Sequence, residues 1–229
     1  MNKIGIIGAL DEELEILKSE MNAFTIKKTA GIDFFSGVIH GKSVVLARCG
    51  VGKVNAAVCT QALIDFYEPD CVINTGVAGA IHDGLEIGDI VISKDLVTHD
   101  FNAEPIIPDY KIPERYVPAD GALVARASEA AAVLQKKGVT IHTGRIATGD
   151  SFINESEIKN KLWTDFEALC VEMEGASIAH ACWLNNVPFV IVRAISDKAD
   201  EEAKVSFEKF VVDASKNSCA IICEMLRLL

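Results

Sequence analysis

Short, strongly apolar runs alternate with helical patterns along this chain, and this alternation constrains the fold more than any other feature. KIGIIG (3–8), CVINTG (71–76) and PFVIVRAIS (188–196) are rich in apolar side chains. A strand without a polar face has to be covered on both sides, which is typical of parallel sheets. Helical patterns lie between such strands and can supply the two covers. The sequence therefore predicts an α/β fold with a mostly parallel sheet.

The remaining segments continue the same alternation. Further strands are predicted at 32–39, 43–49, 89–99, 139–148 and 168–173. Helices are predicted directly after Asp11 and at 53–66, 120–137, 155–162, 174–185 and about 203–228. A loop is predicted at 102–118, because four of the six prolines lie there. No repeat, low-complexity tract or linker interrupts the pattern, so we expect a single domain over residues 1–229.

The charge balance limits the possible partners. The chain carries 33 acidic and 22 basic side chains, a net charge of −11. Such a surface repels polyanions, so we expect binding to neither nucleic acid nor an anionic membrane. The apolar run at the N-terminus is too short for a signal peptide. No stretch approaches the ~20 apolar residues of a membrane span.

Cysteine and histidine usage favours a reduced, metal-free protein. The seven cysteines are odd in number and form no CxxC pair. Buried, reduced thiols are the simplest interpretation. Together with the lack of a predicted signal peptide or membrane span, they lead us to expect a cytoplasmic protein. The five histidines are scattered without a metal-ligand spacing. We expect no metal and no other cofactor.

Two glycine-containing stretches resemble nucleotide-binding motifs but do not match them. GIIGAL lacks the third glycine of a dinucleotide fingerprint. CGVGKVNAA lacks the first glycine of a P-loop, and Val54 stands where a hydroxyl would hold magnesium. A dinucleotide-binding module is therefore disfavoured. The glycines at 50, 52, 76 and 79 fit either tight packing turns or a ligand close to the backbone at strand ends.

Acidic side chains follow several predicted strands. Glu172 and Glu174 lie in the otherwise apolar stretch CVEMEGASIAHACWL (170–184), and Asp197 follows the strand at 188–196. Buried acids are unfavourable unless they are paired or neutralised. A solvated strand face for the two glutamates and a helix N-cap for Asp197 remain alternatives. Among residues 11–13, favourable interaction with a helix dipole competes with a cleft position.

Seven stretches together resemble one enzyme family. GIIGALDEEL, CGVGKVNAA, INTGVAGAIHDGLEIGDIV, TGDSFIN, VEMEGASIAH, PFVIVRAISD and SFEKF are similar, in order and spacing, to the 5′-methylthioadenosine/S-adenosylhomocysteine nucleosidases. That family lies in the purine nucleoside phosphorylase superfamily. The resemblance implies an αβα sandwich around a twisted mixed sheet. It also implies a homodimer and cofactor-free hydrolysis of the adenine–ribose bond, in methionine salvage and methyl-cycle clearance.

The resemblance also implies roles for individual residues. Glu13 would be the general base that activates water, Asp197 the acid facing adenine N7, and Glu174 the ligand of the ribose hydroxyls. Phe152 would stack on adenine, and the Ile153 backbone would read its edge. The other implied substrate-binding residues are Val51, Ala78, Gly79, Glu172, Met173, Arg193, Ser196 and Phe207. Residues 99–118 would lie near the pocket of the partner subunit.

The chemistry suits these residue types. Cleavage builds positive charge on the ribose ring and negative charge on the leaving base, as in sugar hydrolysis. An acid can protonate the base, and a carboxylate can stabilise the ring cation more than the neutral substrate. The chain departs from the family at Val77, where a serine is usual, and at 100–118. A purine nucleoside phosphorylase and a non-catalytic nucleoside-binding or storage protein remain alternatives.

Overall fold

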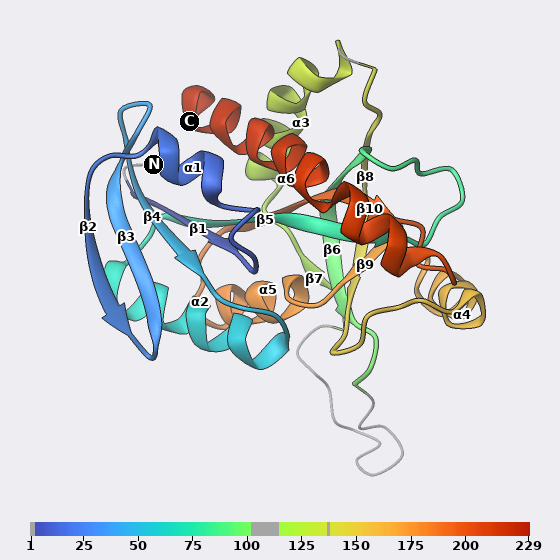
Figure 1. Ribbon diagram of the computed structural model, residues 1–229. Helices are drawn as coiled ribbons and strands as arrows, with labels where there is room; N and C mark the ends of the chain where they lie inside the picture. Colours follow the sequence, from blue (N-terminus) through green and yellow to red (C-terminus); the bar gives the residue numbers. More distant parts are fainter. Residues whose placement is uncertain (1–2, 102–114, 137) are drawn as a thin grey trace.

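The computed structural model describes residues 3–101, 115–136 and 138–229 as one mixed sheet between two layers of helices (Figure 1). The sheet has ten strands. Their bounds are β1 Lys3–Gly8, β2 Asn22–Thr29, β3 Ile32–Ile39, β4 Lys42–Arg48, β5 Cys71–Ala80, β6 Ile90–Thr98, β7 Val117–Pro118, β8 Ile141–Thr148, β9 Cys170–Glu172 and β10 Phe189–Asp197. The helices are α1 Glu15–Glu20, α2 Lys53–Tyr67, α3 Gly121–Gln135, α4 Ser156–Phe166, α5 Gly175–Leu184 and α6 Ala203–Leu228.

The predicted αβα sandwich is confirmed. Helices α1, α3 and α6 lie on one face of the sheet, and α2 and α5 lie on the other (Figure 1). Strand β10 illustrates why its sequence is mostly apolar. Val190 and Val192 join the core under α3 and α6, whereas Ile191 and Ile195 join the core over α2 and α5. Successive side chains of a strand point to opposite faces, so both faces of β10 are buried.

The sheet is mixed in direction, as predicted. Parallel pairs join β10 to β5, β5 to β1, and β1 to β4, while β3 and β2 continue antiparallel to the edge. At the other side, β10, β6, β8, β9 and β5 pair in a closed ring. The carboxyl ends of β10, β5, β1 and β4 therefore meet along one edge of the sheet, where ligands of α/β proteins bind.

Three strands differ from the sequence prediction, and one of them is β7, which lies at the end of the predicted loop at 102–118. No element was predicted for β2, whose side chains are exposed at every position except the last. A strand with neither face buried carries no apolar alternation to detect. Strand β5 is longer than the predicted 71–76, because its pairing with β10 continues from Gly76 opposite Arg193 to Gly79 opposite Asp197. Of the predicted loop at 102–118, residues 102–114 lie outside the described part.

Within the described ranges, no helix is both long and apolar enough to cross a lipid bilayer. All seven cysteines are buried free thiols.

Candidate active site

Glu13 is held by the backbone that surrounds it. Its Oε2 accepts hydrogen bonds from the N–H groups of Ala9 (2.6 Å) and Leu10 (3.0 Å), and its Oε1 accepts one from Val77 N–H (3.1 Å). The chain after β1 thus turns around the carboxylate. This turn explains why α1 begins at Glu15, later than the sequence predicted. Burial raises the pKa of Glu13, while Arg193 and the three N–H groups oppose that rise.

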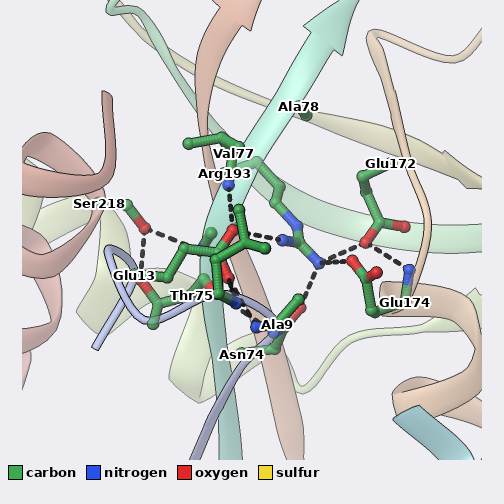
Figure 2. A network of polar contacts seen from close by, with 12 residues as sticks. Ala9, Glu13, Asn74, Thr75, Val77, Ala78, Glu172, Glu174, Arg193 and Ser218 are labelled. Atoms are coloured by element: carbon green, nitrogen blue, oxygen red, sulfur yellow. Dashed lines mark hydrogen bonds and ion pairs between the residues drawn. The ribbon is translucent and has the colours of Figure 1, made fainter. Parts of the chain in front are cut away.

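Arg193, a fully buried residue of β10, faces three carboxylates (Figure 2). Its Nη2 bonds Glu172 Oε2 and lies 3.6 Å from Glu174 Oε2, and its Nη1 lies 4.0 Å from Glu13 Oε1. Nη2 also donates to Asn74 Oδ1 (2.7 Å). Buried charges have to be paired, and breaking such a pair leaves an uncompensated ion. The three acids therefore depend on one guanidinium group.

Glu172 is bonded to protein groups on both of its oxygens. Oε2 accepts from the N–H groups of Glu174 (3.0 Å) and Gly175 (2.7 Å) as well as from Arg193. Oε1 accepts from the Thr148 hydroxyl. A carboxylate at the first N–H groups of α5 is favoured by the helix dipole. Glu172 thus links β8, β10 and α5, and its contact with ribose remains a prediction.

Glu174 occupies the junction between β9 and α5. Its Oε1 accepts from Gly52 N–H (2.9 Å), at the start of α2. Gly52 has φ = 99°, a conformation that side chains with a Cβ rarely adopt. Burial, together with the neighbouring Glu172, raises the pKa of Glu174 to about 7, although Arg193 and the Gly52 N–H oppose the rise.

This pKa predicts a pH dependence of stability. A carboxyl with a folded-state pKa above its ordinary 4.5 favours folding while it is protonated. The free energy of unfolding should therefore fall as pH rises from 4.5 to about 7, because Glu174 then ionises in a buried place. Urea denaturation at a series of pH values measures this slope.

Glu174→Gln is the matched control for that measurement. This substitution should weaken the pH dependence of the free energy of unfolding between pH 5 and 7. The dependence that remains should come from Glu13 and Asp197, whose pKa values are also raised by burial. An unchanged slope in Glu174→Gln would contradict the assignment of the pKa to Glu174.

Asp197 ends β10 and is 2% exposed. Its Oδ2 accepts from the Ser196 hydroxyl (2.8 Å), and its Oδ1 accepts from Ala199 N–H (2.9 Å). Burial raises the pKa of Asp197, and these two hydrogen bonds oppose the rise. The Ser196 hydroxyl also lies 3.4 Å from the carbonyl oxygen of Ala78, in β5.

The end of β5 lies between the acids, and we call its residues 76–79 the floor of the site. A Cβ at Gly76 would lie 2.0 Å from Arg193 Nη1 and 2.6 Å from Glu13 Oε1, and one at Gly79 would lie 2.7 Å from Asp197 Oδ1. Only bare backbone fits at both positions. The two positions are three residues, or about 10 Å, apart along the strand. Glu13 and Asp197 therefore lie against two points of one short strand segment.

Helix α6 supports this floor from the face opposite α2. Ser218 Oγ accepts from Gly76 N–H (3.1 Å) and is hydrogen-bonded to Thr75 Oγ1 (Figure 2). Cys219 Sγ donates to the carbonyl oxygen of Glu13 (2.9 Å). The sequence offered no local sign of these contacts, because helix and floor are about 140 residues apart along the chain.

The other predicted substrate-binding residues differ in how far their side chains are exposed to solvent. Phe152 and Phe207 meet edge to face, with ring centroids 5.8 Å apart, although they come from distant segments. Phe152 and Val51 are exposed, Met173 is partly buried, and Ile153 is buried. Their contacts with a ligand remain predictions.

Sequence reasoning missed Thr148, Asn74 and the contacts that Lys53 makes with Asp100 and Asp150. Lys53 Nζ bonds Asp100 Oδ1 and lies 3.7 Å from Asp150 Oδ2, while Lys53 N–H donates to Asp150 Oδ1 (2.8 Å). Thr148 ends β8, so its strand-end place was the one available signal. Over the described ranges, no group of three or more His, Cys, Asp or Glu side chains could hold a metal ion.

Comparisons with known proteins cover nearly the whole chain. Residues 3–227 match the Phosphorylase superfamily. A 5′-methylthioadenosine/S-adenosylhomocysteine nucleosidase of Geobacillus kaustophilus (strain HTA426) is 44% identical, with 99% of this chain and 97% of that protein covered. One from Haemophilus influenzae (strain PittEE) is 42% identical, with 98% of each covered.

Solved structures are similar over the whole chain. The nucleosidase of Neisseria meningitidis in complex with methylthio-immucillin-A has a TM-score of 0.95 and 36% identity, with both chains fully covered. A futalosine hydrolase of Helicobacter pylori has a TM-score of 0.92 and 34% identity, with 100% of this chain and 98% of that one covered.

Proposed function

Because this chain belongs to the 5′-methylthioadenosine/S-adenosylhomocysteine nucleosidases of the phosphorylase superfamily, which are N-glycosyl hydrolases, we propose that it hydrolyses the adenine–ribose bond of both nucleosides in their name. The products are adenine and the corresponding 5-thioribose. The single observation that carries the proposal is the pair of buried acids, Glu13 and Asp197, at two ends of the Gly76–Gly79 floor.

Asp197 is the proposed general acid. Adenine is a poor leaving group as an anion, so a proton has to reach N7 as the bond breaks. An aspartic acid ordinarily loses its proton well below neutral pH. Burial raises the pKa of Asp197 and thus favours the protonated form that can donate.

Glu174 and Glu13 are the proposed partners of the sugar and of water. Glu174, when ionised, accepts hydrogen bonds from ribose hydroxyls and stabilises the cationic ring of the transition state. Glu13 takes a proton from the attacking water, and its raised pKa makes it a better base near neutral pH. Arg193 holds both carboxylates in place, at 4.0 Å from Glu13 and 3.6 Å from Glu174.

Hydrolysis is favoured over phosphorolysis by the charges around Arg193. A phosphate nucleophile needs fixed cations. Arg193 is buried among Glu13, Glu172 and Glu174. Three carboxylates around one guanidinium leave a negative surplus that repels phosphate and admits neutral water.

The test is adenine release from 5′-methylthioadenosine in phosphate-free buffer. We expect full activity there and no gain when phosphate is added, because water is the nucleophile. Product analysis by chromatography should give free methylthioribose and no sugar phosphate. Activity that requires phosphate would instead identify a phosphorylase.

Glu13→Gln separates an enzyme from a non-catalytic nucleoside-binding protein. The substitution keeps the shape of the side chain and removes the base, so turnover should fall by about 10²–10⁴-fold. Wild-type protein that binds the nucleoside tightly without releasing adenine would support the binding protein.

A homodimer is part of the proposal. Val51, just before α2, and Val54, in its first turn, expose apolar side chains, with Val54 73% exposed. An exposed apolar cluster of this kind suits a subunit contact. Sedimentation equilibrium of the full chain measures the oligomeric state. Seven buried free thiols favour a reducing compartment, and we propose a cytoplasmic location.

A further inference from the structure

A cavity of about 450 Å³ lies at the carboxyl ends of β1 and β4. It is open to solvent and is bordered by the turn between β2 and β3, the end of β4 and the first turns of α2. Its charged and amide side chains are Asp11, Lys18, Lys28, Asp33, Arg48 and Asn55. The mechanism proposed above uses none of these residues.

The cavity continues the line of the proposed active site along the sheet edge. Strands β10, β5, β1 and β4 are consecutive parallel neighbours. Asp197 ends β10, Glu13 follows β1, and Arg48 ends β4. Three strand spacings correspond to about 14 Å. A ligand with its base at β10 and its sugar near β5 and β1 therefore directs its far end toward β4.

The lining of the cavity adjoins the acid cluster along the chain. Gly50 lines the cavity, and Gly52, two residues further on, donates its N–H to Glu174. Cys49 also lines the cavity. Burial raises the pKa of the Cys49 thiol, and the nearby Cys59, Glu174 and Glu13 raise it further. The cavity wall thus lies within electrostatic range of both carboxylates.

The charges of the cavity have both signs. Arg48 Nη1 lies 3.4 Å from Asp11 Oδ2, and Lys28 Nζ lies 4.0 Å from Asp33 Oδ1. Lys18 adds a third cation, so cations exceed acids here in a chain whose net charge is −11. The side chains of both pairs are at least half exposed. Exposed ion pairs are weak and can exchange partners with a ligand.

We infer that this cavity binds the zwitterionic amino-acid end of S-adenosylhomocysteine, with Arg48 and Lys28 facing its carboxylate and Asp11 and Asp33 facing its ammonium group. The inference rests on the proposed function. Methylthioadenosine ends in a methyl group at the same place and makes no such contacts. The cavity therefore sets the preference between the two nucleosides.

The experiment compares the ratio of kcat/KM for S-adenosylhomocysteine to that for methylthioadenosine. In a Lys28→Ala/Arg48→Ala double variant this ratio should fall about fivefold to tenfold, as expected for loss of exposed charge contacts. Added salt should likewise lower the wild-type ratio, because screening weakens exposed ion pairs.

Lys27→Ala is the matched control. Lys27 lies on the same strand as Lys28, but its Nζ lies 5.0 Å from the ring centroid of Phe66 and it does not line the cavity. Its substitution should leave the ratio unchanged. A ratio in the double variant within twofold of wild type would overturn the inference.

A wrong proposed function can be distinguished from a wrong assignment of the cavity. In that case wild-type protein releases adenine from neither nucleoside. Calorimetric titration of S-adenosylhomocysteine into the wild type and the double variant then tests the cavity alone. Equal affinities would overturn the inference, and a weaker affinity of the double variant would support it.

Discussion

Asp197→Asn should lower kcat for adenine release by about 10²–10⁴-fold, the usual cost of removing a general acid. The asparagine Oδ1 can still accept the 2.9 Å hydrogen bond from Ala199 N–H, so the local backbone should be preserved. What the variant loses is the acidic proton for the leaving base. KM should change much less than kcat, because a proton transfer is made only in the transition state.

Steady-state kinetics with methylthioadenosine measure this effect, and thermal melting verifies that the variant is folded. Asp83→Asn is the matched control, since the Asp83 side chain is 96% exposed and lies outside the proposed site. It should keep wild-type kinetics. A kcat of Asp197→Asn within tenfold of wild type would mean that another group supplies the proton.

Arg193→Met should be the most destabilising substitution of the site. It leaves Glu13, Glu172 and Glu174 buried without their shared cation. Removing one partner of a buried ion pair costs about 3–5 kcal/mol in the free energy of unfolding. Urea denaturation at neutral pH measures the loss. The loss should shrink at acidic pH, because the pKa values of Glu13 and Glu174 are raised and the protonated carboxyls no longer need a cation.

Arg126→Met provides the comparison for an exposed pair. Arg126 bonds Glu129 at 2.9 Å with its side chain 49% exposed, and such pairs contribute about 0–1 kcal/mol. If Arg193→Met proved no more destabilising than Arg126→Met, the carboxylates would have to be neutralised by protonation instead of by the guanidinium.

The fold could be predicted for segments whose own residues show that they are buried. Strand β10 is buried at all nine positions, and its apolar run is unmistakable. Strand β2 is exposed almost throughout, so its pairing with β3 depends on the neighbouring strand and leaves no local pattern. The extension of β5 from Val77 to Ala80 also left no local pattern, because β10 supplies the pairing.

The acids of the candidate site could be predicted from the sequence. The residues that hydrogen-bond to the site's charged side chains could not. Glu174 and Asp197 follow apolar strands, which is a strand-end position that sequence can reveal. Their partners come from far along the chain: Gly52 is 122 residues from Glu174, and Asn74 is 119 residues from Arg193. Contacts at such separations have no periodicity in sequence, and they arise only when the sheet brings the strand ends together.

The contacts of Ser218 with Gly76 and of Cys219 with Glu13 have a consequence for biosynthesis. These two residues follow every other group of the candidate site along the chain. A domain generally folds as a unit during translation. The nascent polypeptide therefore cannot assemble the floor beneath the acids until α6 has left the ribosome, and we expect turnover only after that helix docks.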